Sequence, residues 1–459
     1  MSGIDTPLTM ELAEWAASTG TDDIPEPVAH QVRRSLVDYL TAAILGASAE
    51  PAVIVRDYLA AHDSDGSSTV IGVPLRLSPA GAAAANGTAA HALDLDDGYT
   101  PGACHPGGPI LSAALAAGEA MRSDALSLVR AIALGYEVAC RIAGASHPAQ
   151  RRRGFHNTAL VGVFGAATAV AALRGLDAVG FANAYGLAGS HAGGLLSFLD
   201  QGSDVKRYHT GKAARDGLVC ADLAARGLTA PTVVLEGAHG YFHAFTGDQV
   251  DVDHLTGDLG TTWRMLRTYN KPYPCCRHVH GAIDAALQIR EREHLEPESI
   301  ESVRVETFAI AASHDGKDID NLLDAQMSLP YSVAAALVHG EVGMEQFDAP
   351  TRADARIRAI IETTEVLTDD AYTADYPASR AARVHIRANG GEHVAEVMQP
   401  YGEPDNPMSD DAIDHKFRRL AGPILGSPHS ERILEAAWSL DDSARLFEAL
   451  SAAGRVPTA

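Results

Sequence analysis

Residues 154–173 read GFHNTALVGVFGAATAVAAL, a run of small and apolar side chains opened by a polar His-Asn-Thr group. Its length and its lack of alternating polarity favour a buried helix over a strand. We predict a helix that runs to Leu173, with His156 at its positive N-terminal end. Helices with such small side chains pack closely, so this composition favours a helical fold for the surrounding chain.

The same helical pattern extends over residues 7–226. Apolar side chains share one face at helical spacing, for example Leu8, Leu12 and Trp15. Glycine and proline fall between the runs, as expected of helices joined by short loops. The first part of the chain is therefore predicted to be all-α.

The pattern changes near residue 269. Residues 302–307 and 383–387 alternate apolar and polar side chains, which is typical of strands. Asn389-Gly390-Gly391 follows the second run, and Asn and Gly tolerate the positive φ of a tight hairpin turn. After Pro400 a polar segment leads to Ser409, which is predicted to cap a returning helix.

These patterns give a mainly α fold with two domains. We predict a large all-α helical domain of residues 1–268 and 400–459, with a smaller α+β domain of residues 269–399 inserted into it. A chain of 459 residues is long enough for two hydrophobic cores.

The formal net charge of −23 argues against nucleic acid and an acidic membrane surface as partners. An anionic substrate would need the few cations gathered in one pocket. Five cysteines without paired CxxC spacing predict neither a metal nor an iron–sulfur cluster, and they fit a reducing cytoplasm. The start of the chain, residues 1–12, has no secretory pattern, and no apolar run is long enough to span a bilayer.

Titratable side chains gather in two segments near residue 100. Residues 91–97 read HALDLDD and are followed by Gly98-Tyr99, while residues 104–109 read CHPGGP. A solvated loop with capping aspartates would explain any one of these acids. Three acids and two histidines together favour a functional site.

Two further groups stand at predicted helix starts. His156 is either a capping residue or a histidine that meets an anion at the helix N-terminus. Residues 204–212, DVKRYHTGK, are either a solvated face or a site where Lys206 or Arg207 holds a carboxylate.

The second domain contributes two more segments. Residues 271–280, KPYPCCRHVH, lie at the predicted domain junction, where ligand sites often form. Residues 328–332, SLPYS, precede an apolar helix. Tyr331 is either a core aromatic, which composition favours, or a phenolic acid at a cleft.

Taken in order, these segments resemble the MmgE/PrpD family, and the likeness spans nearly the whole chain. It rests on HALDLDDGY with CHPGGP, GYEVACRI, RGFHNT, DVKRYHTGKAARDGL, KPYPCCRHVHGAIDAA, SLPYSVAAAL and NPMSDDAIDHKFRRLA. The resemblance implies a large helical domain with a smaller α+β lid, a homodimer, no cofactor or metal, and a small di- or tricarboxylate as substrate.

The family's active-site positions are matched by Asp94, His105, His156, Lys206, Lys271 and Tyr331. We add Arg207, His209, Arg277 and His278 as candidates for substrate binding. In the implied chemistry His105 moves a proton at carbon with Asp94 orienting its ring. Lys206 and Lys271 clamp carboxylates, and His156 or Tyr331 serves as the acid.

Two departures bear on the reaction. Gly98 stands where the family's cis-aconitate decarboxylases carry Thr, which argues against decarboxylation, and the run at residues 275–278 departs from 2-methylcitrate dehydratases. We expect a cofactor-independent hydro-lyase of the 2-methylcitrate dehydratase type. A cis-aconitate-type decarboxylase, a two-base epimerase of an iminodisuccinate-like acid and a non-catalytic carboxylate-binding protein are the alternatives.

Overall fold

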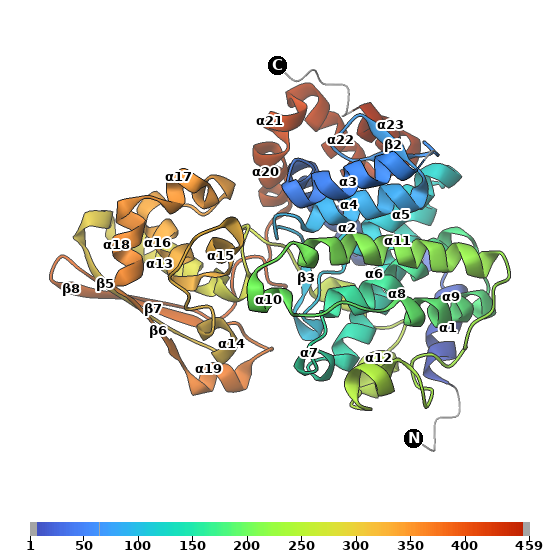
Figure 1. Ribbon diagram of the computed structural model, residues 1–459, viewed down its shortest axis with the longest axis horizontal. Helices are drawn as coiled ribbons and strands as arrows, with labels where there is room; N and C mark the ends of the chain where they lie inside the picture. Colours follow the sequence, from blue (N-terminus) through green and yellow to red (C-terminus); the bar gives the residue numbers. More distant parts are fainter. Residues whose placement is uncertain (1–6, 64, 453–459) are drawn as a thin grey trace. The chain divides into compact units, whose positions relative to one another are not determined.

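The computed structural model describes residues 7–63 and 65–452 (Figure 1). The chain divides into two compact units, each described by itself. Unit 1 comprises residues 1–270 and 409–459, and unit 2 comprises residues 271–408.

Unit 1 is built almost entirely from helices. They are α1 (Leu8–Ser18), α2 (Glu26–Gly46), α3 (Glu50–His62), α4 (Pro79–His91), α5 (Gly107–Met121), α6 (Ala125–Ser146), α7 (Ala149–Arg152), α8 (Asn157–Leu173), α9 (Ala178–His191), α10 (Phe198–Gln201), α11 (Val205–Ala225), α12 (Val252–Thr256), α20 (Asp410–Leu420), α21 (Gly422–Leu425), α22 (Ser427–Ser439) and α23 (Ser443–Ala452).

Helix α8 is the predicted small-residue helix, and its bounds confirm the prediction. It is buried from Asn157 to Ala172 and packs against α5, α6, α9 and α11. Small side chains make this possible: a Cβ on Gly165 would lie 2.8 Å from two carbons of Ile110. The centre of unit 1 therefore depends on the composition of this one stretch.

Two short sheets in unit 1 were not predicted. β1 (Ser68–Val70) pairs with β2 (Leu75–Leu77), and β3 (Gly98–Tyr99) pairs with β4 (Thr268–Tyr269), both antiparallel. Strands of two or three residues are too short to show an alternating pattern. The second pairing matters for the site because it fixes the segment between residues 97 and 105.

Unit 2 is an α+β unit with one four-stranded sheet in the order β6-β5-β7-β8. Only the β5–β6 pair is parallel. Its elements are α13 (His280–Glu293), β5 (Ile300–Thr307), α14 (Ala309–Ala312), α15 (Leu322–Met327), α16 (Leu329–His339), α17 (Ala349–Arg352), α18 (Ala355–Glu362), β6 (Thr364–Thr368), α19 (Asp370–Asp375), β7 (Ala382–Ala388) and β8 (Gly391–Val397).

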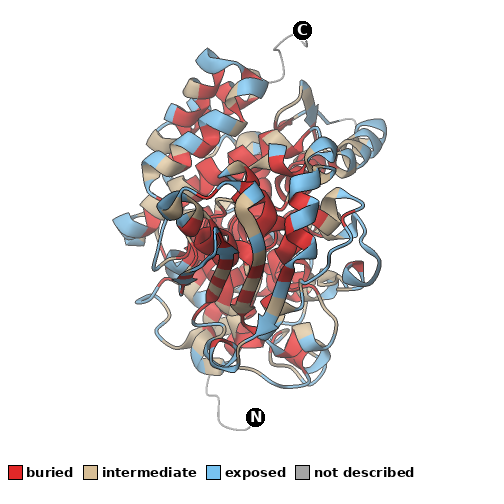
Figure 2. Cartoon of the chain, turned by 90° about the vertical axis from the view of Figure 1, so that its left-hand side faces the viewer, coloured by how far each residue is buried: buried red, intermediate tan, exposed pale blue. Residues whose placement is uncertain are grey.

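The predicted hairpin of unit 2 is confirmed. β7 and β8 are joined by Asn389 at φ 54° and Gly390 at φ 76°, the two positive values that a tight turn requires. Buried residues alternate with more exposed ones along β7, as Figure 2 shows for the strands of this sheet. Helices α13 and α16 belong to the same hydrophobic core.

The segment after β8 differs from the prediction. Residues 400–408 were assigned to the helical domain but belong to unit 2. The Tyr401 amide donates to Asp284, and Glu403 forms a buried ion pair with Arg277 at 3.0 Å. The chain then enters α20, where the Ser409 side chain accepts a hydrogen bond from the Ala412 amide, as predicted for its cap.

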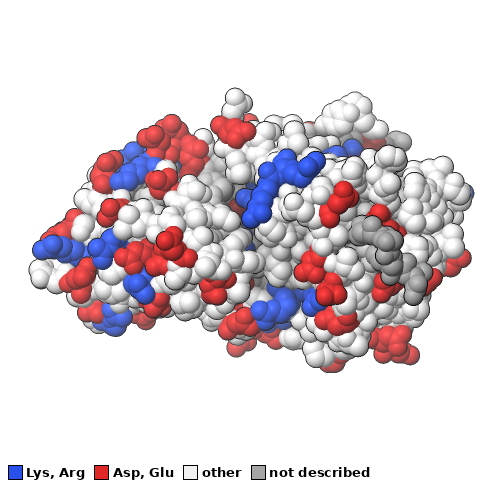
Figure 3. All heavy atoms as spheres, turned by 90° about the horizontal axis from the view of Figure 1, so that it is seen from below, with Lys and Arg blue, Asp and Glu red and all other residues white. Residues whose placement is uncertain are grey.

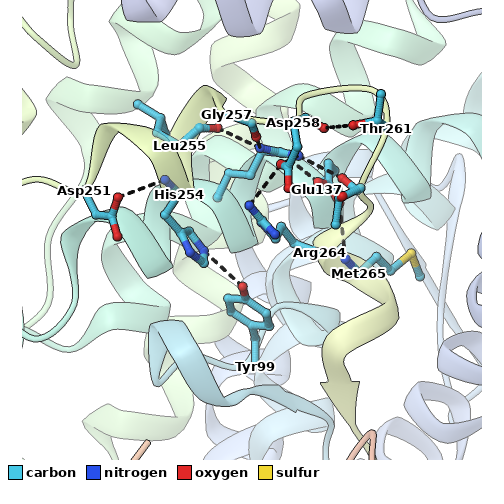
Figure 4. A network of polar contacts seen from close by, with 12 residues as sticks. Tyr99, Glu137, Asp251, His254, Leu255, Gly257, Asp258, Thr261, Arg264 and Met265 are labelled. Carbon is cyan, nitrogen blue, oxygen red and sulfur yellow. Dashed lines mark hydrogen bonds and ion pairs between the residues drawn. The ribbon is translucent and has the colours of Figure 1, made fainter. Parts of the chain in front are cut away.

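A buried arginine on α6 holds the end of α12 and the segment that follows it. Figure 4 labels its partners Glu137, Leu255 and Gly257. The Arg141 guanidinium donates to Glu137 at 2.7 Å and to the carbonyl oxygens of Leu255, Gly257 and Thr262. Below this network in Figure 4, the Tyr99 hydroxyl meets Nε2 of His254 at 3.1 Å. The network thereby reaches β3 and the segment that leads to His105.

Charged side chains of both signs lie on the surface of the protein. On the face in Figure 3, Lys and Arg form a few separate groups among Asp and Glu side chains. Over residues 7–63 and 65–452, no single helix is long and apolar enough to cross a membrane. The bent pair of α2 and α3 passes that test by length and composition together, although α2 is largely buried in unit 1.

Candidate active site

The close contact of α4 with α11 brings two of the predicted segments together. A Cβ on Gly87 would lie 2.9 Å from Cα of Gly211, and one on Gly211 would lie 2.2 Å from the carbonyl oxygen of Ala84. Only glycine at these positions lets the two backbones touch. The loop after α4 therefore lies beside the first turn of α11.

Lys206, in that first turn, forms an ion pair with Asp94 at 2.7 Å. Asp94 has a left-handed backbone conformation with φ 56°, so its carboxylate is held in an uncommon place. The side chains of Lys206 and Asp94 are 13% and 8% exposed, which leaves the pair within reach of a small anion. Two predicted site residues are thus brought together.

Arg207 is also held in this loop, in a way that the sequence did not reveal. Its Nε donates to the carbonyl oxygen of Ala92 at 2.7 Å, and Nη1 donates to Asp204 at 3.1 Å. These contacts position the loop. The predicted role of Arg207 in substrate binding stays a prediction.

His105 is fixed by main-chain contacts. Its Nδ1–H donates to the carbonyl oxygen of Asp97 at 2.7 Å, and its own amide donates to Oγ1 of Thr158 at 3.0 Å. A carbonyl can only accept, so the neutral ring carries its proton on Nδ1 and leaves Nε2 as the basic nitrogen. The His105 side chain is 14% exposed, whereas the side chain of its neighbour His91 is 0% exposed. Of these two rings, solvent therefore reaches that of His105.

The carboxylate that forms an ion pair with His105 is that of Asp96, whereas the sequence predicts Asp94 beside this ring. Asp96 Oδ2 lies 3.7 Å from Nδ1 of His105, whereas Asp94 is paired with Lys206. The Asp97 carbonyl supplies the orienting hydrogen bond. A main-chain acceptor leaves no sequence signal, and the orienting role of Asp94 stays a prediction.

His91 is a candidate that the sequence reasoning placed in the cluster but gave no role. At the last residue of α4, its Nδ1–H donates to Asp96 at 2.9 Å, and its ring centroid lies 4.7 Å from that of His105. Its Nε2 is buried and has no hydrogen-bond partner among the described residues. The His-x₄-Asp spacing across a helix end was the signal available for this pair.

His156 and His209 form a second imidazole pair, from the start of α8 and the second turn of α11. Their Nδ1 atoms lie 3.0 Å apart, which is hydrogen-bond distance. Burial, more than the neighbouring imidazoles and Lys206, holds the pKa of His156 well below its usual value. Burial likewise lowers the pKa of His209 to about 4. Both rings are therefore neutral at neutral pH.

Asp97 is a buried anchor. It accepts hydrogen bonds from the Tyr136 hydroxyl at 2.8 Å and from the Gly107 amide at 3.0 Å, at the start of α5. Burial, followed by the charge of Asp96, raises the pKa of Asp97 to about 8. A carboxyl of this kind remains largely protonated at neutral pH.

The raised pKa of Asp97 predicts how stability depends on pH. The folded protein retains a proton that the unfolded chain releases above about pH 4. The contribution to stability is therefore fully present below that pH and is lost as the pH rises through 8. In the wild type, Asp97 should make the free energy of unfolding decrease between about pH 4 and pH 8. In Asp97→Asn this decrease should be smaller, by up to about 1.4 kcal/mol per pH unit.

Urea unfolding of the full chain at a series of pH values measures this effect. The exposed Asp65→Asn variant is the matched control, and its pH dependence should equal that of the wild type. An unchanged slope in Asp97→Asn would show that Asp97 is ionised in the folded protein.

Four side chains of the site lie close enough to surround a cation. Donor atoms of His91, Asp94, Asp96 and His105 all lie within 4.8 Å of one another. However, the Lys206 ammonium already binds Asp94, and a ring N–H of His91 already binds Asp96. A divalent ion would have to displace both, so this donor set fits a proton-transfer site better than a metal site.

We therefore expect full activity after chelator treatment. The measurement is turnover before and after exhaustive dialysis against a chelator, with metal content determined in parallel. Loss of turnover that one divalent ion restores would contradict this expectation.

The remaining predicted residues belong to unit 2. Lys271 is 1% exposed. Arg277 is engaged by Glu403 and by the carbonyl oxygens of Tyr401 and Pro400, so it holds the segment before α20. His278 stacks on His314, with centroids 5.8 Å apart. Their roles toward substrate stay predictions.

Tyr331 lies in the hydrophobic core of unit 2, fully buried next to Phe347. Its hydroxyl donates to the carbonyl oxygen of Gln346, and burial raises its pKa above the ordinary value. These contacts agree with the core alternative that composition favoured. Its role as an acid rests on the family likeness alone.

Models of two domains from one protein family match consecutive parts of this chain. The family model of the MmgE/PrpD N-terminal domain matches residues 10–253, and that of the MmgE/PrpD C-terminal domain matches residues 273–442.

Curated relatives carry two activities in their names. A cis-aconitate decarboxylase-like protein of Aspergillus oryzae is 29% identical over 97% of this chain and 96% of its own length. The cis-aconitate decarboxylase of Homo sapiens is 26% identical over 91% of this chain and 89% of its own length. The 2-methylcitrate dehydratase of Salmonella typhimurium is 26% identical over 50% of this chain and 49% of its own length.

Proposed function

The chain belongs to the MmgE/PrpD family, and we propose that it is a cofactor-independent lyase acting on a small di- or tricarboxylate by proton transfer next to a carboxylate. The observation that carries the proposal is His105. Its Nδ1–H donates to the Asp97 carbonyl at 2.7 Å, so Nε2 is the basic nitrogen of the neutral ring, in a site that also holds Lys206.

The site contains the groups that such a reaction needs. Dehydration and decarboxylation both pass through carbanion-like character beside a carboxylate, which requires a proton carrier, an acid and nearby positive charge. His105 is the carrier at carbon, and His156 is the acid for a leaving hydroxyl or for the carbanion. Lys206 supplies charge in a largely dry environment, where electrostatic stabilisation is strongest.

Lys206 would bind a substrate carboxylate while it keeps Asp94 as its partner. An ammonium has three donors, so one can remain on Asp94 while another meets the substrate. Lys271 is proposed as a second carboxylate clamp and Tyr331 as a further acid, the roles that the family likeness implies. Arg277 and His278 are proposed as additional substrate-binding residues.

Two reactions remain the leading candidates. Relatives named as cis-aconitate decarboxylases align with almost the whole chain, which supports decarboxylation. Gly98 argues against decarboxylation and so favours the dehydratase that is the main expectation from the sequence. A Cβ there would lie 2.2 Å from the Tyr269 hydroxyl oxygen, so the tyrosine fills the place of the threonine expected in a decarboxylase.

One experiment separates these reactions. The protein is incubated in deuterated water with cis-aconitate, 2-methylcitrate, citrate and iminodisuccinate, and products are followed by proton NMR and mass. Loss of carbon dioxide identifies a decarboxylase, loss of water a dehydratase, and deuterium uptake alone an epimerase. A silent panel from a folded protein that still binds these acids would support a non-catalytic carboxylate-binding role and would sink the proposal.

The proposal also includes a homodimeric assembly and a cytoplasmic location. The family likeness supports a homodimer, which light scattering of the full chain tests. The five cysteines are buried and none of them forms a disulfide, which supports the reducing cytoplasm expected from the sequence.

A further inference from the structure

The His156–His209 pair has a geometry that a simple binding role for His209 does not explain. The two Nδ1 atoms face each other at 3.0 Å, and both rings are largely buried. A hydrogen bond between two imidazoles needs one N–H donor and one bare acceptor. The two rings must therefore adopt complementary tautomers.

Only two neutral arrangements satisfy this contact. When His209 donates from Nδ1, His156 carries its proton on Nε2 and can act as an acid. When His156 donates from Nδ1, its Nε2 is bare and can act as a base. The tautomer of His209 therefore decides which role His156 is able to play.

Charge explains why a partner is needed. If His156 acted alone and donated its Nε2 proton from the neutral ring, the ring would become an imidazolate. If the ring of His156 were protonated beforehand, an imidazolium would lie beside Lys206 and other imidazoles. The low pKa of the ring reflects the cost of that imidazolium. Transfer of a second proton between the rings avoids both charged states.

We propose that His209 is a catalytic partner that passes its Nδ1 proton to His156 while His156 Nε2 protonates the substrate. This inference rests on the proposed function. His156 loses a proton from Nε2 and gains one on Nδ1, and His209 loses one from Nδ1 and takes one on Nε2 from solvent water. Both rings stay neutral, and one proton in total moves from solvent to substrate.

The surroundings of His209 provide a place for the solvent proton to enter. A Cβ on Gly194 would lie 3.2 Å from Nε2 of His209, so this residue's backbone borders that side of the ring. Residues 191–194 are half-buried, and a Cβ on Gly193 would meet nothing within 4 Å. The carbonyl oxygen of Gly194 accepts a hydrogen bond from the His156 amide at 2.9 Å, which ties the same segment to both rings.

The first test uses the substrate-free protein with ¹⁵N-labelled histidine. For this pair, nitrogen NMR should show one bare Nδ1, one protonated Nδ1 and a low-field proton coupled to both, and this shared-proton signal should vanish in His209→Asn. Two rings with Nε2–H tautomers, or a stable imidazolium at neutral pH, would overturn the proposal. This arm needs no turnover, so it decides the pairing even when the proposed function fails.

The second test measures turnover of whichever of cis-aconitate or 2-methylcitrate is consumed. In His209→Asn the amide nitrogen can still donate to His156, but it cannot accept a proton elsewhere. We expect kcat to fall about 100-fold with little change in KM. The curved dependence of rate on deuterium content in the wild type should become linear, because only one proton then moves in the slow step.

Two further variants distinguish a loss of proton transfer from a loss of structure at position 209. His209→Ala should recover activity with added imidazole, and the exposed His243→Asn should behave as wild type. Wild-type kcat in His209→Asn, or a linear isotope dependence in the unmodified enzyme, would show that His209 only positions His156. A silent substrate panel with the shared proton present would sink the proposed function alone.

Discussion

Replacing His105 by Gln should abolish turnover and leave the fold intact. Gln keeps a polar side chain of similar length but has no basic nitrogen, so it cannot take or deliver a proton at carbon. A loss of about 10² to 10⁴ in kcat is the usual scale for removing a general acid or base. Deuterium incorporation into substrate should stop together with turnover.

The fold should tolerate this change because the anchors around His105 are in the main chain. The amide that donates to Thr158 remains, and Asp97 keeps its contacts with Tyr136 and Gly107. Melting temperature and circular dichroism should match the wild type, with exposed His243→Gln as the control. Retained turnover in a folded His105→Gln would remove His105 from the mechanism.

The largest effect on stability is expected at Lys416 in the returning helix α20. Its ammonium is buried, forms an ion pair with Asp38 at 2.6 Å, and also donates to the Leu95 carbonyl at 3.2 Å. Asp38 is completely buried. Lys416→Met removes the cation and leaves that carboxylate unpaired, which typically costs about 3 to 5 kcal/mol.

A double replacement tests this reason. Asp38→Asn with Lys416→Met removes both charges, so urea unfolding should show much of the lost stability restored. Because the Leu95 carbonyl loses its donor in both variants, the free energy of unfolding should stay below that of the wild type even in the double variant. An unfolding free energy for Lys416→Met within about 0.5 kcal/mol of wild type would contradict the pairing.

The helices and the hairpin were predictable because their signals are local. The small-residue run of α8 and the Asn389-Gly390 turn each restrict their own backbone, whatever the rest of the chain does. The two-residue pairing of β3 with β4 was missed for the opposite reason. Gly98 and Tyr269 are distant in sequence, and only their contact in the folded unit gives either residue its structural meaning.

Site residues divide along the same line. Their identities were visible as clusters of titratable groups and in the family likeness, and the structure brings Asp94, His105, His156, Lys206 and His209 into unit 1. Their partners were not visible: a backbone carbonyl orients His105, and Arg207 holds a loop. The contact between His156 and His209 also joins two separate helices.

The sequence by itself determined the family, the mainly α architecture and the set of groups able to move protons, because composition, periodicity and ordered motifs are properties of the chain. Tertiary structure alone decided the hydrogen-bond partner of Nδ1 in each imidazole, whether the Asp97 carbonyl, Asp96 or a second imidazole. Such neighbours come from different elements, and only packing of those elements brings them within hydrogen-bond distance.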